Sequence, residues 1–189
     1  MKKITKIIII TILIIIVLTI LMMILLIYKF FFSATVINNI NEYDERKDSF
    51  THAENVMPDL KLLPKYENIH YQYRKINYFP FYAETMLLIV TYDEETYKNE
   101  LEKIDRMAFL QNPINNNKGD YLIPKHEFVI NNYSFKVLNG DNYYYPKTIG
   151  LIATSDKNNN IAYLYFEDAD IDIITNMENF IEFSFKYKW

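Results

Sequence analysis

The chain has 189 residues, of which 24 are acidic and 20 basic, and it contains no cysteine. The lack of cysteine excludes disulfide bonds, thiolate catalysis and thiolate metal sites. All 24 acidic residues but only 16 of the basic ones follow Lys29, so this part carries a net charge of −8. Such a charge disfavours binding to nucleic acid and to anionic lipid headgroups.

The first element is an apolar segment from Ile7 to Tyr28 that holds no charge, proline or glycine. As a helix it would extend roughly 33 Å, enough to cross a hydrocarbon core of about 30 Å. A helix that is apolar on every face needs apolar surroundings, and no second segment of this chain could surround it. We therefore expect a transmembrane helix at residues 7–28, in contact with the lipid bilayer.

The charges on either side of this segment predict its orientation. Lys2, Lys3 and Lys6 precede it, and Lys29 alone follows it closely. Because positive charges favour the cytoplasmic side, residues 1–6 are expected in the cytoplasm and the rest outside. This predicts a single-pass protein of the cell membrane.

A cleaved secretory signal is the alternative interpretation of the same segment. Such signals have an apolar core of about 7–15 residues, followed by small residues at the cleavage site. Here the core is longer, and the bulky Phe31 and Phe32 stand where small residues would be needed. An uncleaved signal-anchor is therefore favoured.

The segment after the anchor is polar and has no sustained hydrophobic period. We expect residues 29–56 to form a juxtamembrane tether or a partly helical stalk. Pro58 and Pro64 follow, and residues 57–189 are expected to form one extracytoplasmic domain.

Alternation predicts strands in the first half of this domain. Ile69, Tyr71 and Tyr73 fall on one face of a strand, while His70, Gln72 and Arg74 fall on its polar face. The residues from Phe79 to Tyr82 and from Thr85 to Tyr92 continue as strand, and the second of these runs is apolar on both faces. It is the expected central strand.

A helix is predicted after this strand. Asp93 is the expected N-cap, because its carboxylate can accept a hydrogen bond from the first turn. Tyr97, Leu101, Ile104 and Ala108 then follow at helical spacing and should face the sheet.

Strand signals return in the second half of the domain. Hairpins are expected around Asn131-Asn132 and around residues 156–160, and a short closing helix is expected at residues 175–185. The predicted fold class is α+β, an antiparallel twisted sheet with one or two packed helices.

Three stretches carry a resemblance: residues 57–69, the tyrosine-rich strand after them, and residues 91–104. With the anchor, they resemble a group of uncharacterised membrane-anchored proteins of low-GC Gram-positive bacteria. The resemblance covers about half of the chain. It implies an anchor followed by a domain, and it implies no activity and no catalytic residue.

No residue pattern indicates a metal, a cofactor or a nucleophilic site. His52, His70 and His126 lack the spacing of a zinc site and are expected to be solvated. The acidic segment of residues 167–172 resembles the opening of a calcium loop, but Ile173 stands where that loop needs glycine. We therefore expect no metal or cofactor.

Paired carboxylates are the remaining route to an enzyme, in particular a hydrolase of the cell envelope. Glu84 with Asp93, or Glu127 with Glu167, would need to face each other across a cleft at about 5–10 Å. Sequence spacing does not show this, so the enzyme question stays open.

Clustered tyrosines are the stronger candidate for function. Consecutive aromatic residues on a strand project to both faces, so some should meet solvent or a partner. The alternative is that tyrosine simply fits strands and covers a sheet. The candidate partner surface comprises Tyr71, Tyr73, Tyr78, Tyr82, Tyr143, Tyr144 and Tyr145.

The sequence thus favours a membrane-anchored, non-catalytic binding domain. Its expected partner is an envelope protein or the wall glycan, because exposed tyrosines suit both. The alternatives are the envelope hydrolase and a structural or assembly subunit of a membrane complex.

Overall fold

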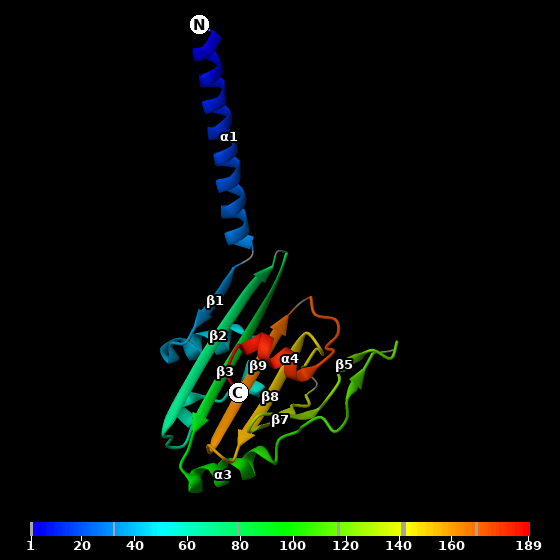
Figure 1. The fold of residues 1–189 in the computed structure, drawn as a ribbon. Helices are drawn as coiled ribbons and strands as arrows, with labels where there is room; N and C mark the ends of the chain where they lie inside the picture. Colours follow the sequence, from blue (N-terminus) through cyan, green and yellow to red (C-terminus); the bar gives the residue numbers. More distant parts are fainter. Residues whose placement is uncertain (1, 32, 79, 117, 141–142, 169) are drawn as a thin grey trace.

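A computed structural model describes residues 2–31, 33–78, 80–116, 118–140, 143–168 and 170–189. It consists of one long helix, α1 (Lys2–Phe31), that projects from a domain built on a seven-stranded sheet (Figure 1). The expected α+β class is therefore confirmed.

Helix α1 is compatible with a membrane span by its length and composition. The span from Lys6 to Lys29 has a mean hydropathy of 3.5, and none of it is buried against the rest of the protein. The hydroxyls of two threonines form hydrogen bonds within the helix. Thr11 donates to the Ile7 carbonyl at 3.0 Å, and Thr19 donates to the Ile15 carbonyl at 2.8 Å. The expected N-terminal apolar helix is confirmed.

The sheet is antiparallel at each strand pairing that the structure describes. A separate two-stranded ribbon follows helix α3 (Glu94–Ile104) and is formed by β4 (Ile114–Asn115) and β5 (Tyr121–Ile123). The order across the large sheet is β1 (Ala34–Ile37), β2 (Asn68–Tyr78), β3 (Phe81–Thr91), β9 (Asn160–Asp168), β8 (Thr148–Ser155), β7 (Tyr133–Val137) and β6 (Glu127–Ile130).

The long β2–β3 hairpin follows the predicted alternation. Tyr71 lies opposite Leu88, and the residues of β3 from Thr85 to Val90 are buried on both faces, as expected for an interior strand. Phe79, which was expected in a strand, lies outside the described residues. The turns at Asn131 and Asn159 have φ of 51° and 48°, a conformation that asparagine tolerates, so both expected hairpins are confirmed.

Helix α3 (Glu94–Ile104) starts where it was predicted. The Asp93 carboxylate accepts hydrogen bonds from the backbone N–H and the hydroxyl of Thr96, at 2.9 and 2.8 Å. Tyr97 and Ile104 are buried, as expected. The expectation for Ala108 is wrong, because the helix ends at Ile104 and Ala108 is exposed beyond it.

The closing helix, α4 (Met177–Phe185), packs on one face of the sheet and confirms the predicted helix. Arg74 was expected on a solvated face, but it is only 5% exposed beneath this helix. Its guanidinium donates hydrogen bonds to the carbonyl oxygens of Phe183 and Ser184, which fixes the last turn of α4 on β2. A cation near a helix C-terminus is favourable because carbonyl groups point at it.

The expected tether is part of the folded domain, so that prediction is wrong. Four short helices follow β1 and cover the second face of the sheet. Tyr43, Phe50 and Val56 from this segment are 0%, 6% and 4% exposed. Strand β1 also extends the sheet by pairing with β2. The helices are η1 (Ile40–Glu42), α2 (Tyr43–Ser49), η2 (Ala53–Asn55) and η3 (Leu60–Leu62).

Several tyrosines are buried in the core between these short helices and the second face of the sheet, and they predict loss of stability at alkaline pH. Burial raises the pKa of Tyr143 to about 12 and also raises the pKa values of Tyr43 and Tyr163. Because a free tyrosine titrates near 10, this contribution to stability is fully present below pH 10. It is lost as the pH rises from about 10 through 12, since only the unfolded chain releases the protons readily.

A titration of the detergent-solubilised chain checks this prediction. We expect the tyrosinate absorbance of the buried rings to rise together with loss of the circular dichroism signal. Full ionisation near pH 10 with the circular dichroism signal intact would contradict the prediction.

Candidate binding site

The seven candidate tyrosines do not share one exposed surface. Tyr144 and Tyr82 are 77% and 40% exposed, and Tyr78 and Tyr145 are half-buried. The other three, Tyr71, Tyr73 and Tyr143, are buried. The expected aromatic sheet face is therefore not available to a partner, and this part of the prediction is wrong.

The reason lies in the segment that was expected to be a tether. The Tyr43 ring meets the Tyr71 ring edge-on at 5.5 Å between centroids, and Phe50 meets Tyr73 at 6.1 Å. These contacts cover the strand face that alternation alone would leave open.

Tyr143 and Tyr145 form a small stack where the chain approaches β8. Their ring centroids lie 5.9 Å apart, and the Tyr145 hydroxyl donates to the Leu138 carbonyl. Tyr144 points away into solvent, and its backbone N–H donates to the Thr148 hydroxyl at 2.6 Å. The Tyr143 ring thus lies against Gly150 on β8, and Tyr144 stays exposed.

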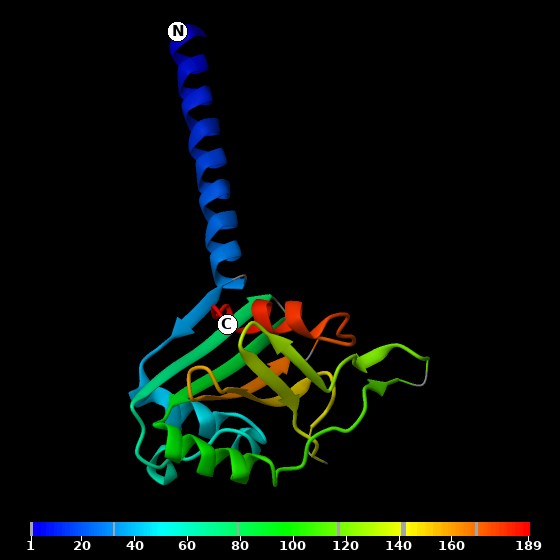
Figure 2. The ribbon, with the colours of Figure 1, turned by 60° about the horizontal axis from the view of Figure 1, so that its bottom comes forward.

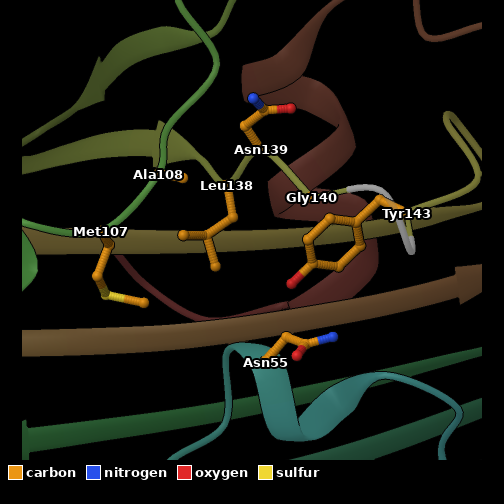
Figure 3. A pocket seen from close by; sticks show the side chains of 7 residues that line it. All are labelled: Asn55, Met107, Ala108, Leu138, Asn139, Gly140 and Tyr143. Atoms are coloured by element: carbon orange, nitrogen blue, oxygen red, sulfur yellow. The ribbon is translucent and has the colours of Figure 1, made fainter.

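A pocket of about 280 Å³ opens beside the Tyr143 ring (Figure 3). Figure 3 shows Tyr143, Leu138, Met107 and Asn55 directed toward a common space, with Asn139 at its margin. The described residues that line it are Asn55, Met107, Ala108, Leu138, Asn139, Gly140 and Tyr143.

Three distant parts of the chain meet at this pocket. Asn55 comes from η2, Met107 and Ala108 follow α3, and the residues from Leu138 to Gly140 follow β7. A backbone hydrogen bond joins two of these parts, because the Asn139 N–H donates to the Ala108 carbonyl at 2.8 Å. No local sequence signal marks such a pocket, because it depends on tertiary packing.

The Tyr143 ring forms one wall of this pocket. Tyr143 is 9% exposed, and its hydroxyl has no hydrogen-bond partner among the residues that the structure describes. The hydroxyl lies against Gly150 on β8, where it is closed to solvent, so the ring and not the hydroxyl borders the pocket. A buried hydroxyl without a partner costs stability, and here it offers no group to a ligand.

Gly150 makes this position of the ring possible. A Cβ atom at Gly150 would lie 2.7 Å from Cζ of Tyr143, which is closer than real Cβ contacts allow. Glycine is therefore needed at this position of β8 because the ring lies so close, and not because the chain turns there.

The chemistry of this pocket suits binding. It offers an aromatic ring, two carboxamides and apolar walls, and the described residues that line it include no carboxylate, imidazole or amine. Such a mixture binds a ligand by shape and a few hydrogen bonds.

The carboxylate pairs considered for a hydrolase are not brought together. Glu84 and Asp93 lie near opposite ends of β3, roughly 30 Å apart at the usual rise per residue. Glu127 on β6 and Glu167 on β9 are separated by β7 and β8, at least roughly 14 Å.

The structure instead places Glu84 directly opposite Glu167 on neighbouring strands. Burial first, and then the charge of Glu84, raises the pKa of Glu167. Glu84 also forms an ion pair with Lys75, so this pair has a structural partner on β2.

The acidic segment and the histidines also lie apart from the pocket. Asp168 accepts hydrogen bonds from the Tyr78 hydroxyl and from the Asp170 backbone, and Asp172 faces Lys147 at 3.9 Å. Within the described ranges no three His, Asp or Glu side chains are grouped as metal ligands would be. His70 was expected to be solvated, but it is half-buried against the Tyr187 ring at 5.2 Å.

Comparison of the chain with models of known families, with curated proteins and with solved structures finds no match.

Proposed function

We propose that this is a single-pass membrane protein whose uncleaved helix α1 keeps the N-terminus in the cytoplasm and the domain outside. The exposed apolar surface of α1 supports this, since every described side chain from Ile7 to Tyr28 is exposed and would need lipid around it. The lysines before the segment support the orientation. The group of membrane-anchored proteins that the sequence resembles has the same arrangement.

The domain's function is binding and not catalysis, and its ligand site is the pocket beside Tyr143. The observation that carries this proposal is the pocket itself, which joins the Tyr143 ring to the carboxamides of Asn55 and Asn139. A volume of about 280 Å³ accepts one ring-sized group. An aromatic ring and two carboxamides suit a sugar residue of the wall glycan, and an envelope protein would have to present a side chain of similar size and polarity.

Asn55→Ala tests this site, because it removes a carboxamide that lines the pocket. We expect binding of soluble muropeptide fragments to weaken about two- to tenfold, the value of one hydrogen bond. Stability should change little, because Asn55 is exposed. Isothermal titration of the detergent-solubilised full-length chain measures the affinity, and scanning calorimetry measures the stability.

Asn158→Ala is the matched control, since this asparagine is also exposed but lies in the turn between β8 and β9, outside the pocket lining. It should leave both affinity and stability unchanged. Equal affinities of the two variants for the fragments, or no binding by the unmodified chain, would contradict the proposed glycan site.

A further inference from the structure

The turn of the β2–β3 hairpin is tied to the chain just after the anchor. Helix α1 ends at Phe31, and the Ser33 carbonyl accepts a hydrogen bond from Asn77 N–H at 2.8 Å. The Asn77 carboxamide also donates to the Ser33 hydroxyl at 3.0 Å. Two residues beyond the helix, the chain is thus already fixed to the hairpin next to its turn.

This connection limits how far the turn can lie from a bilayer that holds α1. The helix continues about 5 Å past Tyr28, and the next two residues reach at most about 7 Å further. Ser33 therefore lies within roughly 12 Å of the hydrocarbon edge. The headgroup layer on each side is roughly 5–8 Å thick, so the turn lies in or next to it.

The other elements at this end of the domain agree with that placement. In Figures 1 and 2 the end of β2 lies beside the end of α1, whereas α3 lies at the opposite end of the domain. Helix α4 reaches the same region, because Phe183 lines an apolar pocket of about 350 Å³ together with Ile76 and Tyr78 near the turn.

Large apolar side chains are exposed at this end. Phe81 is 40% exposed, Ile173 43% and Phe183 63%, although Phe185 two residues later on the same helix is fully buried. Tyr82, also 40% exposed, lies under the Lys75 ammonium group. Exposure of several such groups in one region marks a contact surface.

Some of the charges near this surface are paired within the protein. Lys75 pairs with Glu84, and Asp168 accepts the hydrogen bond from Tyr78. Asp170, which lines the same pocket, and Glu182, which precedes Phe183, are exposed beside it. Aromatic rings beside polar groups are typical of residues in the interface between lipid and water.

We propose that a membrane-proximal patch, made of Tyr78, Phe81, Tyr82, Ile173 and Phe183, lies in the headgroup layer of the bilayer that holds α1. The patch gives the domain a second attachment to the membrane and so fixes its orientation. The inference rests on the proposed anchoring by α1. The patch contacts the lipid surface, because the two-residue connection to α1 holds the patch against that surface.

Single-cysteine variants test the patch in the full-length protein, because the chain has no cysteine of its own. Phe81→Cys and Phe183→Cys report on the patch, and Leu18→Cys reports on the anchor. Leu62→Cys is the matched control, because Leu62 is an apolar residue that is 81% exposed. It precedes Asn68, where β2 begins, and that start of the strand lies roughly 33 Å from the turn. All four positions are exposed, so the fold should tolerate the label.

Each variant is labelled with an environment-sensitive fluorophore and reconstituted in phosphatidylcholine vesicles with nitroxide-bearing lipid. We expect loss of fluorescence at positions 81 and 183 with the nitroxide near the headgroup, loss at position 18 with the nitroxide deep in the bilayer, and no loss at position 62. Because the contact is apolar, added salt should leave these losses unchanged.

The outcomes separate the two proposals. Quenching at position 18, with positions 81 and 183 as bright as position 62, would overturn the patch and leave the anchor standing. No quenching at position 18 would overturn the anchor, and the patch with it.

Discussion

Tyr43→Ala is expected to lower the free energy of unfolding by about 3–5 kcal/mol, as for other large buried aromatic residues. Tyr43 is fully buried, its ring packs against Tyr71, and its hydroxyl donates to the Pro58 carbonyl at 2.7 Å. The substitution leaves a cavity between α2 and the sheet and breaks the hydrogen bond to the segment before η3. Urea unfolding of the detergent-solubilised chain, followed by circular dichroism, measures the change.

One further variant separates the contribution of the hydroxyl from that of the ring, and another is the control. Tyr43→Phe removes the hydroxyl alone and should cost about 1 kcal/mol, because the Pro58 carbonyl loses its partner. Tyr66→Ala, at a position that is 42% exposed, should change the free energy of unfolding by less than about 0.5 kcal/mol. If Tyr43→Ala behaved like Tyr66→Ala, the segment from β1 to η3 would be a tether and not part of the domain.

Gly150→Ala is expected to destabilise the protein by about 1–3 kcal/mol, the usual cost of adding an atom to a filled core. The new Cβ would lie 2.7 Å from Cζ and 3.1 Å from Cε1 of Tyr143. The ring would have to move, and its stack on Tyr145 would be lost. The same variant should lose binding at the pocket, because Tyr143 forms one wall. Thermal unfolding and the muropeptide titration measure the two effects.

A second substitution shows whether the clash is the cause. Tyr143→Ala in the Gly150→Ala background removes the obstructing ring, so the double variant should be less destabilised than the sum of the two single variants. Additive effects would contradict a direct contact between Gly150 and Tyr143.

Local sequence patterns predicted those elements whose signals are themselves local. Alternation gave the faces of β2 and β3, and the Asp93 carboxylate marked the first residue of α3. Helical spacing also predicted α4, whose Met177, Phe180 and Ile181 are buried as expected.

The segment from β1 to η3 was missed because its burial depends on distant partners. Tyr43 and Phe50 stand in a highly charged stretch, and only Tyr71, Tyr73 and Tyr165 across the sheet show why they are buried. The candidate site was missed in part for the same reason. Tyr143 was among the candidate tyrosines, but its pocket requires η2, the chain after α3 and the end of β7 to meet.

The most direct test of the central claim, that α1 stays in the membrane with the domain outside, is cysteine labelling of intact cells with a membrane-impermeant maleimide. Lys157→Cys places the only thiol in the exposed turn between β8 and β9, and Lys3→Cys places it before the apolar segment. We expect Lys157→Cys to be labelled on intact cells in a full-length, membrane-bound product, and Lys3→Cys to be labelled only after permeabilisation. Labelling of Lys157→Cys only after permeabilisation, or on a shorter product released into the medium, would contradict the claim.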